Sequence, residues 1–488
     1  MRSKFNIVQL FLLLFLFENL YALRPAAVAG SFYTNNKSQL QTEIKTLLRN
    51  AKTFEQKNIN ALIVPHAGYV FCANVASTAY KTLNKRYKNI FLIGSSHYIS
   101  FDGASIYNIG DYNTPLGNVK VNKTLATKLI ENSQYFTFHK DAHKKEHTLE
   151  VQLPFLQTIY GKDINIIPII IATSNLGTIK SIAKGLSPYF NDDNLFIIST
   201  DLSHYPTFDD ANSVDKKTLD SLTKNNPQKF VEALAKNEDA KIEALQTSAC
   251  GWSSLLTLLY ITNNKPYKYE ILEYKNSAHS KYGDKKKVVG YGAMRVYKSD
   301  EFFLTLKEKQ ELLNIANLSL YQAIANKKKL VVDESKISPK LKEHLGAFVT
   351  LHKNKILRGC IGTFGPDKPL YKVIVDMTIE SALHDTRFKE VKQSELKDIK
   401  IEISVLTPRK KISSLDEIVI GKHGIYIKKG SKTGTYLPHV ATEMKWDTKE
   451  FVGNCSEEKV GIGYNGYKDA ELFIYEAIVF DIKDILKD

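Results

Sequence analysis

The chain has 488 residues, of which 43% are hydrophobic and 24% charged, a balance that is typical of globular proteins and excludes disordered or membrane-embedded chains. This length exceeds what one ordinary core accommodates, so we expect two domains. The formal net charge is +15, but the lysines are spread along the chain without an arginine-rich block, zinc-finger spacing or aromatic RNA-binding signature. We interpret the charge as a lysine-rich surface and find no nucleic-acid motif.

The first 22 residues have the pattern of a secretory signal peptide. Arg2 and Lys4 precede an unbroken apolar run at 10–17, and Ala22 follows a short polar break. A bilayer span needs roughly 20 apolar residues, so we expect no transmembrane span beyond this leader. The prediction is export to the periplasm or the extracellular space, with cleavage after Ala22. The alternative is a membrane anchor formed by an uncleaved leader.

From residue 60 to about residue 295, short apolar runs alternate with longer amphipathic stretches, one of which predicts a helix over 216–235. The runs are nearly continuous in aliphatic residues, which is typical of strands buried on both faces of a mostly parallel sheet. The spacing between them leaves room for crossover helices, so we predict an α/β domain with flanking helices. The clearest strand candidates are 61–64, 90–93, 164–171 and 195–198.

Side chains that can bind metal follow three of these strands. His66 comes after the first run, His97 after the second, and Asp201 and His204 after the run at 195–198. Ligands and catalytic groups collect at the carboxyl edge of an α/β sheet, so we expect these side chains to converge. Converging imidazoles indicate a metal site or a proton-transfer site.

Cys250 is the candidate for a further ligand. It lies between small residues, just before an apolar, helix-like run at 255–260. Two imidazoles and a thiolate suit iron, copper or zinc and disfavour magnesium and calcium. The alternative is a buried, inert cysteine. The chain has only four cysteines, which excludes a disulfide scaffold.

A further histidine series needs a separate interpretation. His139, His143 and His147 are spaced so that a helix would place all three on one face, as in a zinc site. The segment around the first two is polar and lysine-rich, so we expect His139 and His143 to be solvated. His147 and Glu150 would share a helical face beside apolar anchors, and we take both as candidate pocket residues.

The character of the sequence changes after residue 297. A polar stretch leads into a long amphipathic helix predicted over 304–329, and a second helix is expected around 371–381. Because the remaining segments are shorter, we interpret residues 303–488 as a smaller α+β domain. Its strand candidates are 345–351, 356–363, 399–406 and 418–429.

Arg358, Cys360 and Arg387 form the candidate site of this second domain. Glycines on both sides of Cys360 allow close backbone approach, and Arg358 with Arg387 would suit an anion. A nucleophilic Cys360 needs a nearby base, for which His384 and His439 are the candidates. The alternative is a tight packing motif around a buried cysteine.

Six ordered motifs lie between residues 24 and 297. They are Arg-Pro-Ala-Ala-Val-Ala-Gly-Ser-Phe-Tyr at 24–33, Pro-His-Ala-Gly-Tyr at 65–69, Gly-Ser-Ser-His at 94–97, Glu-His-Thr-Leu-Glu at 146–150, Ser-Thr-Asp-Leu-Ser-His at 199–204 and Cys-Gly at 250–251. Together they resemble the Memo family, whose bacterial members are known as AmmeMemoRadiSam system protein B. That family is similar in fold to the class III extradiol dioxygenases, which hold non-haem iron in an α/β domain.

The resemblance implies a mononuclear metal bound by His66, His97 and Cys250, with Fe²⁺ expected and copper as the alternative. The dioxygenases have a carboxylate as third ligand. A thiolate would donate more electron density to the metal, which speaks against ordinary ring cleavage.

The resemblance also implies catalytic residues beside the metal. His204 or His147 would act as general acid or base, and Asp201 would orient an imidazole or fix its tautomer.

The second half carries its own set of motifs. They are Gly-Ala-Phe-Val-Thr-Leu at 346–351, Leu-Arg-Gly-Cys-Ile-Gly-Thr-Phe at 357–364, Asp-Thr-Arg-Phe at 385–388, Ile-Glu-Ile-Ser-Val-Leu-Thr-Pro at 401–408 and Tyr-Leu-Pro at 436–438. They resemble the AMMECR domain, AmmeMemoRadiSam system protein A. The family's Arg-Asp-Pro-Arg-Phe element is here His-Asp-Thr-Arg-Phe at 384–388, so site residues transfer less directly at this cleft.

The resulting expectation is an exported fusion of a Memo-like metal-binding domain at 24–297 and an AMMECR domain at 303–488. Its expected function is a metal-dependent oxidoreductase that activates oxygen or a bound substrate. The system name implies a radical-SAM pathway partner. The alternative is a non-catalytic module that binds a metal or a peptide.

Overall fold

The computed structural model describes residues 23–365 and 367–486, and the chain divides into two compact units, Met1–Glu301 and Phe302–Asp488. The predicted signal peptide, residues 1–22, lies outside the described residues. Within the described ranges, no helix is long and apolar enough to cross a membrane.

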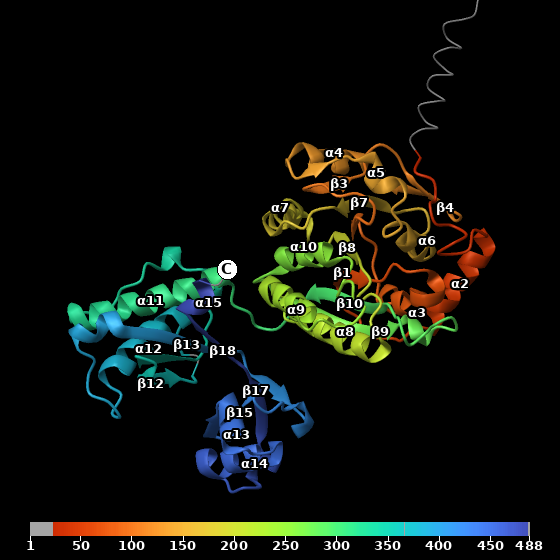
Figure 1. Cartoon of the computed structure of the whole chain (residues 1–488). Helices are drawn as coiled ribbons and strands as arrows, with labels where there is room; N and C mark the ends of the chain where they lie inside the picture. The colour runs from red at the N-terminus through yellow and green to blue at the C-terminus, as the bar shows by residue number, and fades with distance from the viewer. Residues whose placement is uncertain (1–22, 366, 487–488) are drawn as a thin grey trace, which may run out of the picture. The chain divides into compact units, whose positions relative to one another are not determined.

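A large mixed sheet forms the centre of the first unit, and helices cover both of its faces (Figure 1). The strands are β1 (Ile59–Val64), β2 (Asn89–Ser95), β3 (Ala104–Ile106), β4 (Tyr112–Thr114), β5 (Gly117–Val121), β6 (Phe136–Thr137), β7 (Asn165–Ile171), β8 (Asn194–Ser199), β9 (Tyr267–Asn276) and β10 (Gly290–Lys298). They lie in the order β4-β5-β7-β2-β8-β1-β10-β9, with β3 beside β7 and β6 beside β3. The strands from β5 to β1 are parallel, while β10 runs antiparallel to β1. The mostly parallel sheet expected from the sequence is confirmed.

The helices of this unit differ from the prediction at one place. They are α2 (Lys37–Asn50), α3 (Tyr69–Tyr80), α4 (Lys123–Glu131), α5 (Lys140–Lys144), α6 (Leu153–Tyr160), α7 (Leu176–Leu186), α8 (Phe208–Leu222), α9 (Pro227–Asp239) and α10 (Trp252–Thr262). The single helix predicted over 216–235 is wrong, because the chain breaks between α8 and α9. The Asn226 side chain accepts a hydrogen bond from Lys229 N, and Pro227 occupies the first turn, where its missing N–H costs nothing.

The central strands are apolar because both of their faces are covered. Every residue of β1, β2 and β8 is buried. Alternate residues of β1 point to opposite faces: Leu62 and Val64 join the apolar cluster of α2, α3 and α6, whereas Ala61 and Ile63 join that of α7 and α10. Burying one such large aliphatic side chain is worth about 1.5–3 kcal/mol, so polar residues are displaced to the strand ends.

The second unit contains two antiparallel sheets, each with its own apolar core. The strands are β11 (Ala347–Lys353), β12 (Ile356–Thr363), β13 (Ile399–Leu406), β14 (Lys410–Ile412), β15 (Gly424–Lys429), β16 (Lys432–Tyr436), β17 (Glu471–Tyr475) and β18 (Ala477–Asp481). The first sheet has the order β12-β11-β13-β18 and the second β14-β17-β15-β16. The α+β class predicted for this half is confirmed.

Helices flank these sheets. They are α11 (Leu306–Ala325), α12 (Leu370–Leu383), α13 (Pro438–Met444), α14 (Thr448–Asn454) and α15 (Ile482–Leu486). α11 begins at a capping box, in which Thr305 accepts a hydrogen bond from Glu308 N and the Glu308 carboxylate accepts one from Thr305 N. The packing of α11 and α12 against the first sheet encloses the larger of the two cores (Figure 1).

Candidate metal centre

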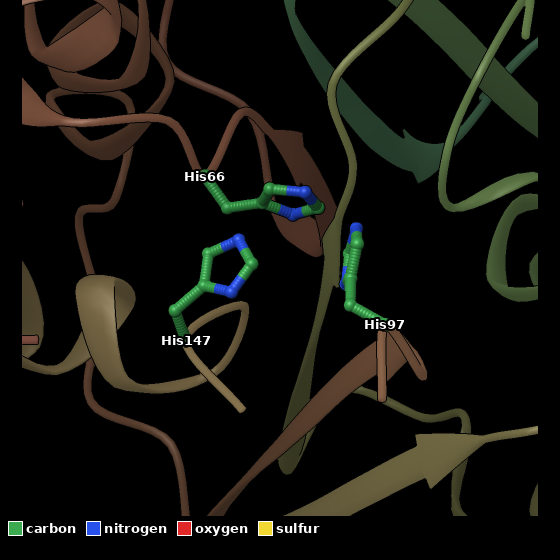
Figure 2. Close-up of side chains that lie close together, drawn as sticks. All are labelled: His66, His97 and His147. Atoms are coloured by element: carbon green, nitrogen blue, oxygen red, sulfur yellow. The ribbon is translucent and has the colours of Figure 1, made fainter. Parts of the chain in front are cut away.

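Three imidazoles meet at the carboxyl edge of the large sheet. His66 follows β1, His97 follows β2, and His147 lies in the segment between α5 and the short 3₁₀ turn Glu150–Gln152. One ligand nitrogen from each ring lies within 4.8 Å of the others, a spacing that suits a single metal ion. Figure 2 shows the rings facing one another, with His97 viewed edge-on beside His66 and His147. The convergence predicted from the strand ends therefore includes His66, His97 and also His147.

A close approach of backbone segments makes this meeting possible. Gly94, near the end of β2, lies against the loop that carries His147. A Cβ atom at Gly94 would lie 2.5 Å from Thr148 Oγ1, inside van der Waals contact. A side chain at this position would push the loop, and His147 with it, away from the sheet.

The thiol of Cys250 is next to the first histidine. Cys250 Sγ lies 3.2 Å from His66 Nε2, and it accepts a hydrogen bond from Asp201 N at 3.3 Å. Cys250 is placed by the turn before α10, where its backbone N–H donates to Asp201 O. The structure thus places the predicted thiol ligand beside His66, whereas the ligand atoms that lie within 4.8 Å of one another belong to His66, His97 and His147.

Asp201 and His204 follow β8 and lie on the same edge. Asp201 Oδ1 accepts a hydrogen bond from the backbone N–H of His66 at 2.8 Å, and Asp201 Oδ2 lies 4.0 Å from His66 Nε2. The backbone of His204 is bridged to Thr247 and Val289, while its Nε2 is buried without a hydrogen-bond partner among the described residues. Asp201 therefore holds the loop of His66, and His204 has an uncommitted ring nitrogen.

Glu146 is a functional residue that the sequence reasoning missed. Its Oε2 accepts a hydrogen bond from His97 N at 2.8 Å, and its Oε1 lies 3.2 Å from His97 Nδ1. Oε1 also accepts hydrogen bonds from the backbone N–H groups of His147 and Thr148. One buried carboxylate therefore orients two of the three imidazoles. In the sequence, Glu146 directly precedes His147, and this adjacency was the feature that indicated a carboxylate near the imidazoles.

Burial and charge give the three imidazoles different proton affinities. Burial, reinforced by His97, lowers the pKa of His66 to about 3, and burial together with His66 lowers that of His147 to about 4. Burial also opposes a charge on His97, but the hydrogen bond and charge of Glu146 outweigh it and raise the His97 pKa. The pKa of Glu146 falls to about 2: burial opposes its charge, and the contact with His97 outweighs burial.

The remaining titratable groups are shifted by burial. Burial, followed by repulsion from Asp201, raises the pKa of the Cys250 thiol, so the thiol is neutral at pH 7 before any metal binds. Burial lowers the pKa of His204 and raises that of Asp201. The imidazoles of His66, His147 and His204 and the Cys250 thiol are thus neutral at pH 7.

Two expectations for the histidine-rich segment are wrong. His143 is not solvated: it is 1% exposed, and its ring nitrogens contact Ser105 Oγ at 3.0 Å and Tyr112 Oη at 2.9 Å. Glu150 is not a pocket residue, because its carboxylate binds Arg24. Both errors have one cause. α5 ends at Lys144, so no continuous helix carries the series and helical spacing does not apply.

The N-terminal segment of the described chain clamps this loop. Arg24 is 3% exposed and forms an ion pair of 2.5 Å with Glu150. Its other nitrogens donate to the carbonyl oxygens of His143 and Glu146. Arg24 therefore fixes both ends of the segment that presents His147.

In the second unit, the two predicted arginines are already paired with carboxylates. Arg358 donates to Glu395 at 3.1 and 3.2 Å, and this contact lowers the Glu395 pKa to about 2. Arg387 donates to Asp385 at 2.8 and 2.9 Å and to the carbonyl oxygen of Cys360. Asp385 also accepts a hydrogen bond from Cys360 N. The anion-binding role of the arginines stays a prediction.

The thiol of Cys360 points to a hydroxyl. Cys360 Sγ lies 3.3 Å from Thr350 Oγ1, across the pair β11–β12. The first base candidate, His384, is exposed and contacts Glu380 Oε2 at 2.9 Å. The second, His439, is exposed on α13. The nucleophilic role of Cys360 therefore gains no support from a contact with either base.

The side chains that converge in the first unit leave buried ring nitrogens without a hydrogen-bond partner, and this arrangement suits a bound metal ion. The three imidazoles approach closely, yet His204 Nε2 is buried without a hydrogen-bond partner in the described part of the chain, and so is His147 Nδ1, although Glu146 Oε1 lies 3.4 Å from it. Leaving a buried polar atom unpaired costs about 1–3 kcal/mol, which a cation bound by His147 would relieve at that residue. Nitrogen and sulfur donors of this kind suit iron, copper or zinc.

The sequence matches family profiles over both halves. The family profile described as "Memo-like protein" matches residues 24–295, and the profile "AMMECR1" matches residues 313–480. A MEMO1 family protein of Thermoplasma acidophilum is 30% identical over 275 residues, covering 56% of this chain and 97% of its own. A MEMO1 family protein of Nitrosopumilus maritimus is 29% identical over 282 residues, covering 56% of this chain and 99% of its own.

Two solved structures superpose on this structure with low TM-scores. An uncharacterized protein from Pyrococcus horikoshii superposes with a TM-score of 0.32 at 30% identity, covering 36% of this chain and 91% of that chain. An uncharacterized protein from Escherichia coli K12 has a TM-score of 0.34 at 16% identity, covering 48% of this chain and 98% of that chain.

Proposed function

Because the chain belongs to the Memo-like protein family over residues 24–295 and carries an AMMECR1 domain over 313–480, we propose that its first unit is a non-haem metal redox protein. The single observation that carries this proposal is the cluster of His66, His97 and His147, whose ligand nitrogens lie within 4.8 Å of one another. The Cys250 thiol at 3.2 Å from His66 Nε2 adds a soft donor. Such a donor set supports Fe²⁺, with copper as the alternative.

His66, His97 and Cys250 are the proposed ligands, and His147 is the competing third or additional ligand. When bound, the metal would supply redox chemistry and Lewis acidity. Its binding requires the Cys250 thiol to lose a proton, which the buried surroundings resist in its absence. His66 is already neutral at pH 7, since its pKa lies near 3.

Nearby residues have proposed roles in proton transfer and positioning. The lowered pKa values of His147 and His204 keep both rings neutral at pH 7, so each is able to accept a proton from a bound substrate. Asp201 holds His66 through a backbone hydrogen bond and does not itself need to titrate. These assignments make His147 and His204 bases in the substrate-bound state and acids afterwards.

The reaction we propose uses dioxygen as the oxidant and the bound substrate as the reductant. Oxygen consumption should therefore be matched by oxidation of the substrate. The fusion supports a shared substrate for the two domains, with a radical-SAM enzyme as a pathway partner. The proposed location is outside the cytosol, because residues 1–22 have the signal-peptide pattern.

The test is anaerobic loading of the full chain with Fe²⁺ or Cu²⁺, followed by metal analysis and exposure to oxygen. We expect one metal ion per chain, and loss of metal in His66→Ala, His97→Ala and Cys250→Ser. The matched control is His139→Ala, an exposed histidine of the same unit, which should bind metal like the wild type. Retained metal in the first three variants would exclude this ligand set.

Further outcomes show which residues bind the metal, whether the protein turns over a substrate and whether it is exported. If His147→Ala loses metal while Cys250→Ser retains it, the three-histidine set replaces the proposed one. Metal binding without oxygen consumption across substrate classes would support the binding module, a metal- or peptide-binding protein without turnover. Sequencing of the mature N-terminus from fractionated cells tests export: a start at Leu23 outside the cytosol supports cleavage after Ala22.

A further inference from the structure

The hydroxyl of Ser199 makes three short contacts inside the core of the first unit. It lies 2.7 Å from the carbonyl oxygen of Thr148, 3.0 Å from Gln152 Nε2 and 3.1 Å from His66 Nδ1. Ser199 is 0% exposed, so these contacts account for its hydrogen bonding. A hydroxyl has one hydrogen to donate and two lone pairs with which to accept.

The direction of each contact follows from the partners. A carbonyl oxygen cannot donate, so the 2.7 Å contact uses the single hydrogen of Ser199. Both other partners must then be donors. Gln152 meets this condition, because its Nε2 also donates to the Pro65 carbonyl oxygen while its Oε1 accepts from Tyr80 Oη. His66 must therefore carry its hydrogen on Nδ1, which leaves the lone pair on Nε2.

The second imidazole is fixed in a different way with the same result. The carboxylate of Glu146 accepts hydrogen bonds from three backbone N–H groups, those of His97, His147 and Thr148. Surrounded by donors, the carboxylate accepts at its contact with His97 Nδ1 as well. His97 then also carries its hydrogen on Nδ1 and has its lone pair on Nε2.

We infer that Ser199 and Glu146 are positioning residues that select the Nδ1–H tautomer of His66 and His97, so that both rings offer Nε2 to a metal ion. The inference rests on the proposed metal site and names the residues that prepare it. The Nε2 of His66 lies 3.2 Å from Cys250 Sγ, so the selected lone pair faces the third proposed ligand. In the metal-free protein this lone pair accepts the hydrogen of the neutral thiol.

The first test is a long-range ¹H–¹⁵N NMR spectrum of the metal-free full chain, labelled with ¹⁵N at histidine and recorded at a pH above the raised pKa of His97, where its ring is neutral. Signals are assigned through His66→Gln and His97→Gln. We expect both rings to have a protonated Nδ1 and an unprotonated Nε2. A protonated Nε2 on either ring in the wild type would overturn the inference. This readout needs no metal, so it decides the inference even if the proposed metal function fails.

The second test removes the acceptors. Ser199→Ala should shift His66 into a mixture of tautomers and weaken Zn²⁺ binding, measured by calorimetry, by about 10–100-fold. The matched control is Ser77→Ala, because Ser77 is 1% exposed and donates only to the Asn74 carbonyl oxygen, away from any imidazole. An unchanged His66 tautomer in Ser199→Ala would contradict the inference.

Variants of Glu146 separate positioning from folding. Glu146→Gln keeps one acceptor oxygen, so we expect it to retain more Zn²⁺ affinity and more of the His97 tautomer than Glu146→Ala. Equal losses in both variants, with His97 still protonated at Nδ1, would exclude a tautomer-selecting role. If Glu146→Ala does not fold, the wild-type spectrum and Glu146→Gln still decide the question.

Discussion

At the scale of single residues, two nearby glutamates have separate tasks. Glu146 orients imidazoles, whereas Glu150 anchors the N-terminal segment. The Glu150 carboxylate is 0% exposed and accepts hydrogen bonds from Arg24, from the backbone N–H groups of Ala27 and Val28, and from Tyr33 Oη. It fixes the start of the unit to the loop that carries His147.

Removal of this anchor should be costly. Glu150→Ala leaves Arg24 as an unpaired buried charge, and breaking a buried pair in this way costs about 3–5 kcal/mol of folding free energy. Urea unfolding followed by tyrosine and tryptophan fluorescence measures the loss. The control is Glu55→Ala, which removes an exposed ion pair with Lys57 and should change stability little. Similar stability of the two variants would contradict the structural role of Glu150.

A buried aspartate predicts a pH dependence of stability. Asp215 is 0% exposed, accepts hydrogen bonds from Ser203 and Tyr274, and has its pKa raised by burial from 3.8 to about 7. The folded state therefore binds a proton more tightly than the unfolded state. Its contribution is fully present below pH 3.8 and is lost as the pH rises through about 7.

Asp215→Asn should remove this dependence. The difference in unfolding free energy between wild type and variant should shift by an amount on the order of 4 kcal/mol as the pH rises from about 4 to about 8, to the disadvantage of the wild type. Urea unfolding at a series of pH values measures it, and the difference cancels contributions of other groups. A pH-independent difference would mean that the Asp215 carboxyl titrates normally.

At the scale of elements, β12 shows how an edge strand is protected. One side of β12 pairs with β11, and side chains cover hydrogen-bonding groups on the other. On that other side, Asp385 accepts from Cys360 N and Arg387 donates to Cys360 O. Such capping blocks pairing with another chain. The residues predicted as a site in the second domain thus have a structural task at the strand edge.

Loss of one cap should destabilise the second unit. Asp385→Ala deprives Cys360 N–H and Arg387 of their acceptor, at a cost of about 1–3 kcal/mol. Differential scanning calorimetry on the full chain should show a lowered transition for this unit and an unchanged one for the first. Asp398→Ala, at an exposed aspartate of the same unit, serves as the control. An equal effect of both substitutions would argue against edge capping.

Element positions were predictable where burial alone decides them. β13 coincides with the predicted segment 399–406, because the alternating apolar residues of this strand record which face is covered. The break between α8 and α9 was missed, since the Asn226 cap acts through one hydrogen bond that periodicity does not register. The segment from 145 to 149 was misjudged because its conformation depends on Arg24, far away in sequence.

At the scale of the whole molecule, the two units have separate cores. Two apolar clusters lie wholly within the first unit and two within the second. We therefore expect recombinant fragments 23–301 and 302–488 to fold independently. Each should give a cooperative calorimetric transition. A fragment that remains unfolded would show that its core needs the other unit.

The sequence predicted only those site residues whose positions follow from the ends of the parallel strands. His66, His97, Asp201 and His204 were found because parallel strands deliver their ends to one edge of the sheet. The contacts that Ser199 makes with Gln152, Thr148 and His66 were not found, because hydrogen-bond direction depends on three segments that meet only in the folded unit.

The contacts of Ser199 also restrict where protons travel. The chain from Gln152 through Ser199 ends on the Thr148 carbonyl oxygen, which has no proton to pass on. This series of hydrogen bonds runs in one direction, toward the carbonyl oxygen. Ser199 therefore cannot relay a proton to or from His66 Nδ1. A proton exchanged at His66 therefore has to pass through its Nε2, which lies 3.2 Å from Cys250 Sγ.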